Sequence, residues 1–275
     1  MKACDLIGFL EREERAMRVE ITRVRGSSPR EEGAVMVASP SAMVGTIGGG
    51  QLEYMALDEA RKLLKLGQSS GFMDVPLGPE IGQCCGGRVE ITLIEMDSAA
   101  RVKLVADVEA QEAVLPHVYV FGAGHVGRAL ADLFQHLPVR CLLVDSRSEE
   151  LGLSQANVEK RLTALPEAEV RGAPAGSAFI VLTHDHALDF LLTSEALVRT
   201  DARWVGMIGS ATKRVKFERF AHSECDGLSA AALHCPIGAG GSKDKRPEVI
   251  AAMVVADVLT ALTSEPAAQL QEATR

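Results

Sequence analysis

The chain has 275 residues, of which 47% are apolar and only 4% aromatic, and its formal net charge is −8. That length predicts two domains, with cores built mainly from aliphatic side chains. The negative charge argues against a nucleic-acid-binding face, because phosphate neutralisation requires clustered lysine and arginine. The apolar run at residues 249–256 is too short to cross a membrane, and the N-terminus lacks the apolar core of a signal peptide. We therefore predict a cytoplasmic protein that binds neither nucleic acid nor membrane.

The first half of the chain shows the alternation of apolar and polar residues that is typical of β-strands. Strands are predicted over residues 18–24, 34–38, 43–47 and 88–95. A helix follows the triplet Gly48-Gly49-Gly50, because Leu52, Ala56 and Leu63 fall on one helical face. We predict a small α+β domain over residues 1–98. Residues 99–115 are polar and weakly patterned, which predicts a connector.

The second half of the chain alternates strands with helices. Strands are predicted over residues 118–121, 139–144, 178–182 and 204–208, and helices over residues 126–135, 187–199, 213–221 and 247–262. This order is typical of a doubly wound parallel sheet. The fold class is therefore α/β, with a Rossmann-like domain over residues 116–275 behind the smaller α+β domain.

A glycine motif, Gly122-Ala-Gly124-His-Val-Gly127, lies between a predicted strand and a predicted helix. In that context the first glycine permits a sharp turn, the second allows a phosphate to approach the backbone, and the third lets helix and sheet pack closely. Asp145 ends the next strand and is expected to accept a hydrogen bond from a ribose hydroxyl. Arg147 is an alternative partner for an extra phosphate. The competing interpretation is that the glycines serve only the geometry of the fold.

Three more loops are expected at the same edge of the sheet, where ligands of doubly wound proteins bind. His184 and His186 follow one strand, and their chemistry would suit metal ligation or proton transfer. Two histidines alone are not a complete ligand set, so we favour helix capping by Thr183 or Asp185 in this loop. The third loop, residues 234–238, follows a short last strand.

The loop between these two, after the strand at 204–208, contains Ser210, Lys213 and Arg214. Ser210 is predicted to cap the helix that follows. The two cations are predicted either to bind phosphate or to form a solvated pair.

Two adjacent cysteines lie in the loop Gly82-Gln-Cys84-Cys85-Gly-Gly87. Flanking glycines leave the thiols accessible, so a thiolate there could meet a soft metal or a sulfur atom. The alternative is a buried pair of small residues. The glycine triplet at Gly48 opens a helix, where backbone N–H groups could hold an anion or form a tight turn without a ligand.

Eight stretches of the chain, in one order, resemble the XdhC/CoxI family of xanthine dehydrogenase accessory proteins. The eight stretches are Gly26-Ser-Ser-Pro-Arg30, Gly45-Thr-Ile-Gly-Gly-Gly50, Gly82-Gln-Cys-Cys-Gly-Gly87, Val120-Phe-Gly-Ala-Gly-His-Val-Gly127, Leu143-Val-Asp-Ser-Arg147, Thr183-His-Asp-His-Ala-Leu-Asp189, Met207-Ile-Gly-Ser-Ala-Thr-Lys-Arg214 and Cys235-Pro-Ile-Gly238. After the last stretch this chain departs from the usual family pattern, which leaves open the roles of Lys243 and Lys245.

The resemblance implies an accessory protein or chaperone that binds the molybdenum cofactor (Mo-molybdopterin). It further implies help with cofactor sulfuration and with insertion into apo xanthine dehydrogenase. The implied partners are the molybdenum subunit of that enzyme, a cysteine desulfurase and cofactor-synthesis enzymes, and the implied assembly is a homodimer. In the family, a cysteine of the Cys-Gly-Gly motif is implicated in cofactor binding, and this implies that Cys85 ligates molybdenum, with Cys84 beside it.

Together with the loops described above, this gives a set of predicted cofactor-binding residues: Cys84, Cys85, Gly48, Gly49, Gly50, Gly122, Gly124, Gly127, Asp145, Arg147, His184, Ser210, Lys213 and Arg214. We expect the sulfur of the first half to face the phosphate-binding loop of the second half across a shared cleft. The main alternatives are an NAD(P)-dependent oxidoreductase, with His184 or His186 as its acid or base, and a redox-sensing dinucleotide-binding protein.

Overall fold

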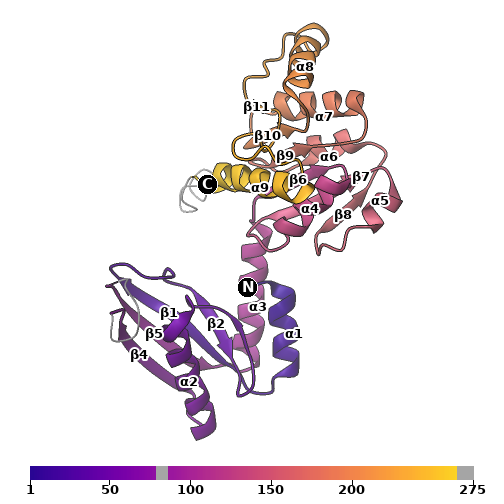
Figure 1. The fold of residues 1–275 in the computed structure, drawn as a ribbon. Helices are drawn as coiled ribbons and strands as arrows, with labels where there is room; N and C mark the ends of the chain where they lie inside the picture. Colours follow the sequence, from indigo (N-terminus) through magenta and orange to yellow (C-terminus); the bar gives the residue numbers. More distant parts are fainter. Residues whose placement is uncertain (79–85, 265–275) are drawn as a thin grey trace. The chain divides into compact units, whose positions relative to one another are not determined.

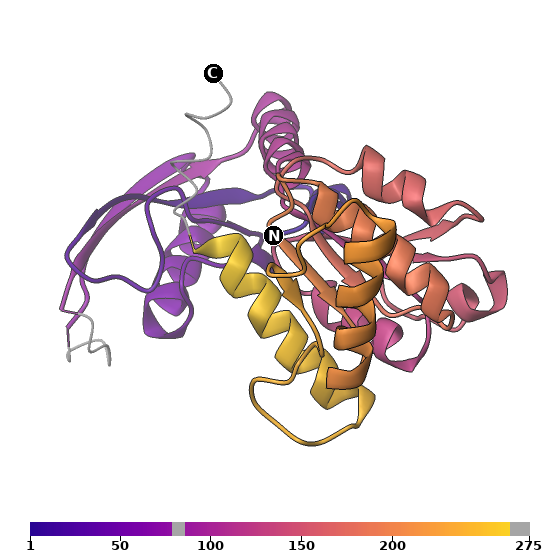
Figure 2. The same cartoon turned by 90° about the horizontal axis from the view of Figure 1, so that it is seen from above.

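The computed structural model describes residues 1–78 and 86–264 and contains two compact units, Met1–Val114 and Leu115–Arg275 (Figures 1 and 2). The first unit has an antiparallel sheet and the second a parallel one, so the predicted α/β fold class is confirmed. Within the described ranges, no helix combines the length and apolar character needed to cross a bilayer.

The first unit is built on a five-stranded sheet in the order β3-β2-β1-β5-β4, with every neighbouring pair antiparallel. Its strands are β1 (Met17–Arg25), β2 (Val35–Ala38), β3 (Met43–Gly45), β4 (Ser70–Pro76) and β5 (Arg88–Glu95). The sequence predicted four of the five. The strand it missed, β4, lies at the edge, where Val75 is the only buried residue and the alternating pattern is therefore weak.

Helices cover both faces of this sheet. α2 (Gly50–Leu66) packs its apolar face, including Ala56 and Leu64, on inward side chains of β1 and β5 such as Ile21 and Ile91. On the other face, α1 (Ala3–Arg12) and α3 (Ser98–Ala113) pack together over Val37. Alternate residues of a strand point to opposite faces, and in β1 and β5 the apolar ones are those that face α2.

Helix α3 occupies the stretch where we predicted a connector. Asp97 caps it by accepting a hydrogen bond from the N–H of Ala100 at 2.7 Å. Its helical pattern is weak because only Leu104 and Val108 are buried. Arg101 ties it to the first unit by donating to the carbonyls of residues 10, 13 and 14 at 2.7–2.9 Å. The stretch is therefore an integral part of the first unit.

The second unit is built on a six-stranded parallel sheet in the order β11-β10-β9-β6-β7-β8. Its strands are β6 (His117–Phe121), β7 (Arg140–Asp145), β8 (Glu159–Leu162), β9 (Ala178–Val181), β10 (Trp204–Met207) and β11 (Leu233–His234). Its helices are α4 (His125–Phe134), α5 (Ser148–Gly152), α6 (Pro166–Gly172), α7 (His186–Val198), α8 (Ala211–Glu224) and α9 (Pro247–Thr263).

These helices form two layers around the sheet (Figures 1 and 2). α4, α5 and α9 share one core with Val118 and Val120 of β6, while α6, α7 and α8 share the other with Tyr119 and Phe121. The helices that follow β6 and β7 lie on one face of the sheet, and those that follow β8 and β9 lie on the other. The neighbouring strands β6 and β9 are therefore followed by helices in opposite layers. A doubly wound sheet binds its ligands outside the carboxyl ends of two such strands.

Candidate functional site

The glycine motif forms the turn between β6 and α4. Gly122 has a φ of +117°, and a Cβ there would lie 2.4 Å from the carbonyl oxygen of Leu182. A Cβ on Gly127 would lie only 1.8 Å from the carbonyl oxygen of Gly122. Gly124 differs, because a Cβ there would meet no heavy atom of the described residues within 4 Å. Two glycines therefore allow close packing, and the third leaves the loop open on its outer side.

The open position coincides with the start of α4. Gly124 is the N-cap residue, and no side chain of the described residues caps the helix. The first N–H groups of a helix have no intrahelical partner, and the helix dipole favours an anion in front of them. This geometry is compatible with a phosphate group, and phosphate binding at the loop stays a prediction.

Two charged side chains hold this loop in place. Asp145, at the end of β7, accepts from the N–H of Ala123 at 2.7 Å. Arg128 of α4 donates to the carbonyl oxygen of Ala123 at 2.6 Å and pairs with Glu150 at 2.7 Å. Both polar groups of the Ala123 backbone are thus fixed, which orients the neighbouring peptides of the loop.

Asp145 has different partners from the ribose hydroxyl that we predicted. Its Oδ1 accepts from the N–H and Nε of Arg147, and its Oδ2 accepts from Ala123 and from Nη2 of Arg147, all at 2.7–3.0 Å. A carboxylate has about four acceptor positions, so this one is saturated. Burial opposes ionisation, but these hydrogen bonds outweigh it and lower the pKa of Asp145. Arg147 is likewise engaged and is not free for a second phosphate.

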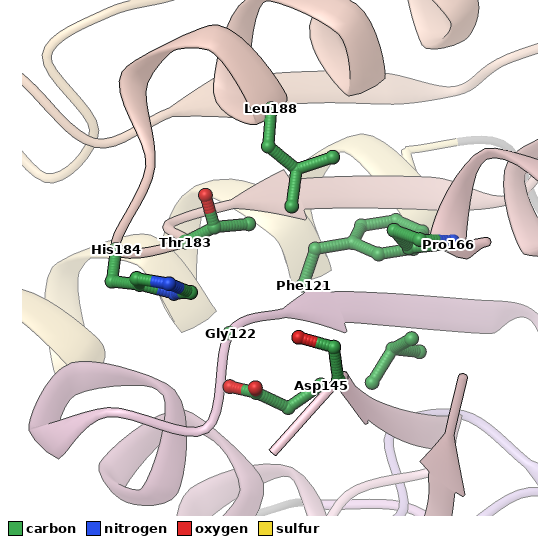
Figure 3. A pocket seen from close by; sticks show the side chains of 9 residues that line it. Phe121, Gly122, Asp145, Pro166, Thr183, His184 and Leu188 are labelled. Atoms are coloured by element: carbon green, nitrogen blue, oxygen red, sulfur yellow. The ribbon is translucent and has the colours of Figure 1, made fainter. Parts of the chain in front are cut away.

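A small cavity lies at this edge of the sheet, beside Gly122 and between the ends of β7 and β9 (Figure 3). Figure 3 shows Thr183 and His184 on one side of the end of β6 and Asp145 on the other. Pro166 and Leu188 also line the cavity, whose volume is about 20 Å³. That volume holds about one water molecule. The cavity is too small for a nucleotide base in this conformation.

The histidine loop after β9 is organised by capping. Asp185 caps α7 by accepting from the N–H groups of Ala187 at 2.7 Å and Leu188 at 3.4 Å, which confirms the capping interpretation. His184 and His186 are both exposed. Among the residues that the structure describes, no group of three or more histidine, cysteine or acidic side chains could hold a metal ion.

Lys213 was predicted as a phosphate ligand, but it lies in a buried ion pair with Asp189 of α7. Asp189 is fully buried, and Lys213 is 8% exposed. The other oxygen of Asp189 accepts from the N–H and the hydroxyl of Thr183 at 2.8 and 2.7 Å. The pair therefore positions the loop that lines the small cavity, and the ammonium group of Lys213 is already bound by Asp189.

Arg214 is also occupied. Its guanidinium donates to the carbonyl of Leu233 at 2.7 Å, to the carbonyl of Ala230 at 3.2 Å and to Glu218 at 2.9 Å. Ser210 caps α8 by accepting from the N–H of Lys213 at 3.3 Å, so that part of the prediction is confirmed. Arg214 thus anchors the segment before β11 in place of a ligand phosphate.

Cys235, directly after β11, is buried. Burial raises the pKa of its thiol, although the charges of Lys213 and Arg214 act in the opposite direction. The net result favours the neutral thiol, which is a poor nucleophile and a poor metal ligand.

The glycine triplet of the first unit already holds an anion, the carboxylate of Glu53. Oε2 of Glu53 accepts from the hydroxyl of Thr46 at 2.5 Å and from the N–H groups of Ile47 at 3.1 Å and Gly49 at 3.3 Å. The hydroxyl of Thr46 accepts from the N–H of Gly48 at 3.1 Å. A cofactor phosphate at Gly48–Gly50 would therefore have to displace Glu53. The sequence offered a signal for this contact, because an acid in the first turns of a helix often binds the preceding loop.

Replacing Glu53 by alanine should lower the free energy of unfolding by about 1–3 kcal/mol, because two backbone N–H groups and a hydroxyl lose a charged acceptor. Chemical denaturation measures the change. Glu59→Ala on the same helix is the matched control, since Glu59 makes only a surface pair with Lys62 and its loss should cost at most about 0.5 kcal/mol. Equal effects of the two substitutions would contradict the anchoring role of Glu53.

Three motif stretches that are far apart in the sequence converge in the first unit. Ser27 forms a parallel β-bridge with Gly86, and a Cβ on Gly87 would lie 2.1 Å from the carbonyl oxygen of Ser27. A Cβ on Gly48, whose φ is +126°, would lie 2.8 Å from Cβ of Pro29. The loop at residues 26–30 therefore contacts both the glycine triplet and the end of the cysteine loop. No local pattern in the sequence indicates that these stretches meet.

Cys84 and Cys85 lie outside the described residues. The described chain resumes at Gly86, whose N–H donates to the carbonyl of Leu77 at 2.8 Å, while the N–H of Leu77 donates to Gly87 at 2.7 Å. The residues that follow the two cysteines are thus paired with the rest of the first unit. The role of the cysteines stays a prediction.

Comparisons with known proteins agree with this architecture. The family model described as the XdhC Rossmann domain matches residues 118–258, and the model described as the XdhC and CoxI family matches residues 9–75. The uncharacterized protein YqeB of Escherichia coli K12 is 25% identical over an alignment of 260 positions, which covers 90% of this chain and 43% of that protein. The chain thus spans less than half the length of this relative.

The fold is also similar to a solved structure. A crystal structure described as a xanthine dehydrogenase from Bacillus halodurans superposes with a TM-score of 0.78. The sequence identity is 17%, and the match covers 98% of each chain. At this identity the likeness concerns the fold.

Proposed function

The chain belongs to the XdhC and CoxI family, and from that premise we propose that it is an accessory protein that binds the molybdenum cofactor for a xanthine dehydrogenase. In this role it supports sulfuration of the cofactor and its insertion into the apoenzyme, and it need not oxidise a substrate itself. The single observation that carries the proposal is the uncapped start of α4 at Gly124, which is open and fits the phosphate of the cofactor.

The two adjacent cysteines of the first unit suit the metal of that cofactor. When bound, the group supplies a soft, sulfur-rich metal, and thiolates are the protein ligands that such a metal prefers. We propose Cys85 as that ligand, with Cys84 beside it. The loop at residues 26–30 pairs with the residues that follow them and so supports the end of the cysteine loop. The proposed metal ligand does not depend on Gly48–Gly50.

The rival dinucleotide-dependent functions receive less support from the geometry. Such proteins commonly bind a ribose hydroxyl through the acid at the end of the second strand. Here Asp145 has its acceptor positions filled by the chain itself, and its side chain is 4% exposed. His184 and His186, either of which was the predicted acid or base of the oxidoreductase alternative, are both exposed. We therefore place the accessory role first.

The proposal includes partner proteins, a cellular compartment and an oligomeric state. The molybdenum subunit of a xanthine dehydrogenase would receive the cofactor, a cysteine desulfurase would supply sulfur, and cofactor-synthesis enzymes would supply the cofactor. We propose that the protein acts in the cytoplasm as a homodimer.

Co-expression tests the proposed role. An apo xanthine dehydrogenase produced together with this chain should contain more sulfurated cofactor and show higher activity than the same enzyme produced alone. Cyanide-releasable sulfur measures the sulfurated cofactor, molybdenum content measures the total cofactor, and xanthine oxidation measures the activity. An enzyme that reaches the same sulfur content and activity without the chain would overturn the accessory role.

A further inference from the structure

The edge strand β4 of the first unit has an unpaired side. β4 is last in the strand order of its sheet, and no other strand of the described chain pairs with its outer side (Figure 1). An unpaired strand edge presents N–H and carbonyl groups that can pair with a strand of another molecule. Proteins commonly prevent such pairing by keeping edge strands short or by placing charged side chains along them.

The other three edge strands of the two described sheets have this kind of protection. β3 has three residues, β11 has two, and β8 has four, of which Glu159, Lys160 and Arg161 are charged. β4 has seven residues and contains neither lysine nor arginine. Its one charged residue, Asp74, forms an ion pair with Arg88 at 2.6 Å. Among these four edges, β4 is therefore the one suited to pairing.

The hydrogen bonds at both ends of β4 establish which residues face outward. The N–H of Glu95 donates to the carbonyl of Ser69 at 2.8 Å, and the N–H of Leu77 donates to the carbonyl of Gly87 at 2.7 Å. The pairing with β5 has no register shift between residues 70 and 76. Because successive residues alternate in direction, the odd-numbered residues bond to β5 and the even-numbered ones present their backbone groups to the unpaired side. All of these except Pro76 have an N–H to donate.

The side chains of the even-numbered residues lie on the face of the sheet opposite α2. Met73 and Val75, which alternate with them, pack in the core beneath α2. Phe72 is 62% exposed, although burial of an aromatic ring is strongly favourable. Ile94 of β5 is opposite Ser70 on the same face and is 48% exposed. The edge thus combines backbone donors and acceptors with exposed apolar side chains.

We infer that β4 is the interface between two copies of this chain, which pair their β4 strands antiparallel about a twofold axis through Phe72. The two five-stranded sheets then form one continuous sheet. Phe72 lies opposite Phe72 of the second copy, where the two backbones exchange a pair of hydrogen bonds and the two rings contact each other. On each side of the axis, Ser70 of one copy lies opposite Asp74 of the other, and these backbones also exchange hydrogen bonds.

Charge favours a second copy in this register. The axis through Phe72 keeps the two Asp74 carboxylates apart, because each lies opposite a small neutral serine. An axis through Asp74 would set like charges opposite each other, and it would set Phe72 opposite Pro76, which has no N–H to donate. An axis through Met73 would set the ring of Phe72 opposite the carboxylate of Asp74. The inference rests on the proposed function, since it locates the interface of the proposed homodimer.

Size-exclusion chromatography with light scattering, over a range of concentrations of the full chain, tests the interface. Wild type should be a dimer. Phe72→Lys should raise the dissociation constant of the dimer by about tenfold or more, because an aromatic pair is lost and two like charges face each other. Tyr54→Lys is the matched control, since Tyr54 is an aromatic residue of α2 that is 66% exposed and lies outside β4. It should leave the dissociation constant unchanged.

Disulfide cross-linking with diamide as the oxidant tests the register. Phe72→Cys should form a covalent dimer well above the wild-type level, because Cα atoms of a directly opposite pair lie about 5.5 Å apart and a disulfide spans about 4.4–6.8 Å. Ser70→Cys should not exceed the wild-type level. The two copies of residue 70 would be offset by four residues, or about 14 Å along the strands.

The remaining outcomes separate this inference from the proposed function. A wild-type dimer that Phe72→Lys leaves equally tight, or equal cross-linking of Phe72→Cys and Ser70→Cys, would overturn the β4 interface and leave the proposed homodimer in place. A wild type that is monomeric at every concentration would overturn both. The co-expression experiment measures the accessory role independently of either result.

Discussion

The Gly127→Ala variant is expected to lose about 3 kcal/mol or more of its free energy of unfolding. A methyl group at this position would lie 1.8 Å from the carbonyl oxygen of Gly122 and 3.1 Å from a methyl group of Leu182. The first contact is with backbone, so α4 or the turn before it must move, and overpacking of this kind typically costs about 1–3 kcal/mol or more. Urea denaturation followed by circular dichroism measures the loss.

The matched control is Gly124→Ala, the same substitution three residues earlier. Gly124 has a φ of −65°, and a methyl group there would meet no heavy atom of the described residues within 4 Å. Its effect on stability should be below about 1 kcal/mol, which is the range for N-cap changes. Equal losses in the two variants would contradict the distinction between packed and open glycines. In a folded Gly124→Ala variant, reduced cofactor retention would support phosphate binding at this loop.

Lys213→Met should be destabilising to a similar degree, with an expected loss of about 3–5 kcal/mol in the free energy of unfolding. The substitution removes the cation from a buried pair and leaves the carboxylate of Asp189 buried without a counter-charge. Because Asp189 also holds Thr183, the loop beside the small cavity should become more mobile. Denaturation gives the stability, and amide hydrogen exchange at residues 183–188 reports the loop.

A second substitution distinguishes the charge effect from lost packing. Adding Asp189→Asn to Lys213→Met removes the unpaired charge while an amide oxygen still accepts from Thr183, so the double variant should regain part of the lost stability. Lys216→Met, at an exposed position on the same helix, should change stability by less than about 0.5 kcal/mol. A double variant no more stable than Lys213→Met alone would contradict the buried-pair explanation.

The architecture of the second unit was largely predictable, because its signals are local. The motif from Gly122 to Gly127 lies within one strand–turn–helix segment, and the sheet strands are short apolar runs. The elements missed there, α5, β8 and α6, are short, and the four residues of β8 are mostly exposed at the sheet edge. With few buried side chains, such elements leave little periodicity in the sequence.

The partners of the charged side chains were not predictable to the same degree. A motif indicates that Lys213, Arg214 and Asp145 lie near the edge of the sheet where ligands bind. It does not indicate which groups of the chain itself they pair with. Asp189 lies 24 residues before Lys213, and its approach depends on how α7 and α8 pack on the sheet. Arg214 likewise meets carbonyls 16 and 19 residues away. Such contacts follow from tertiary packing rather than from local spacing.

The convergence of loops in the first unit also follows from tertiary packing. Ser27 reaches Gly86 because β1 pairs with β5 along their whole length, and that register is a property of the sheet. Pro29 also lies close to Gly48, which follows β3 on the other side of the sheet order. All three stretches are recognisable in the sequence, but no local pattern links them. The structure shows that the loop at residues 26–30 belongs beside the end of the cysteine loop.

Retention of cofactor by cysteine variants tests the central proposal most directly. Wild-type chain, Cys85→Ala and Cys4→Ala would be purified from cells that make the molybdenum cofactor, and bound molybdenum and pterin would be measured per chain. Cys4 is an exposed free cysteine and serves as the matched control. We predict that wild type and Cys4→Ala retain both components and that Cys85→Ala loses most of both with its circular dichroism spectrum unchanged. Wild-type amounts of molybdenum and pterin on Cys85→Ala would contradict the account.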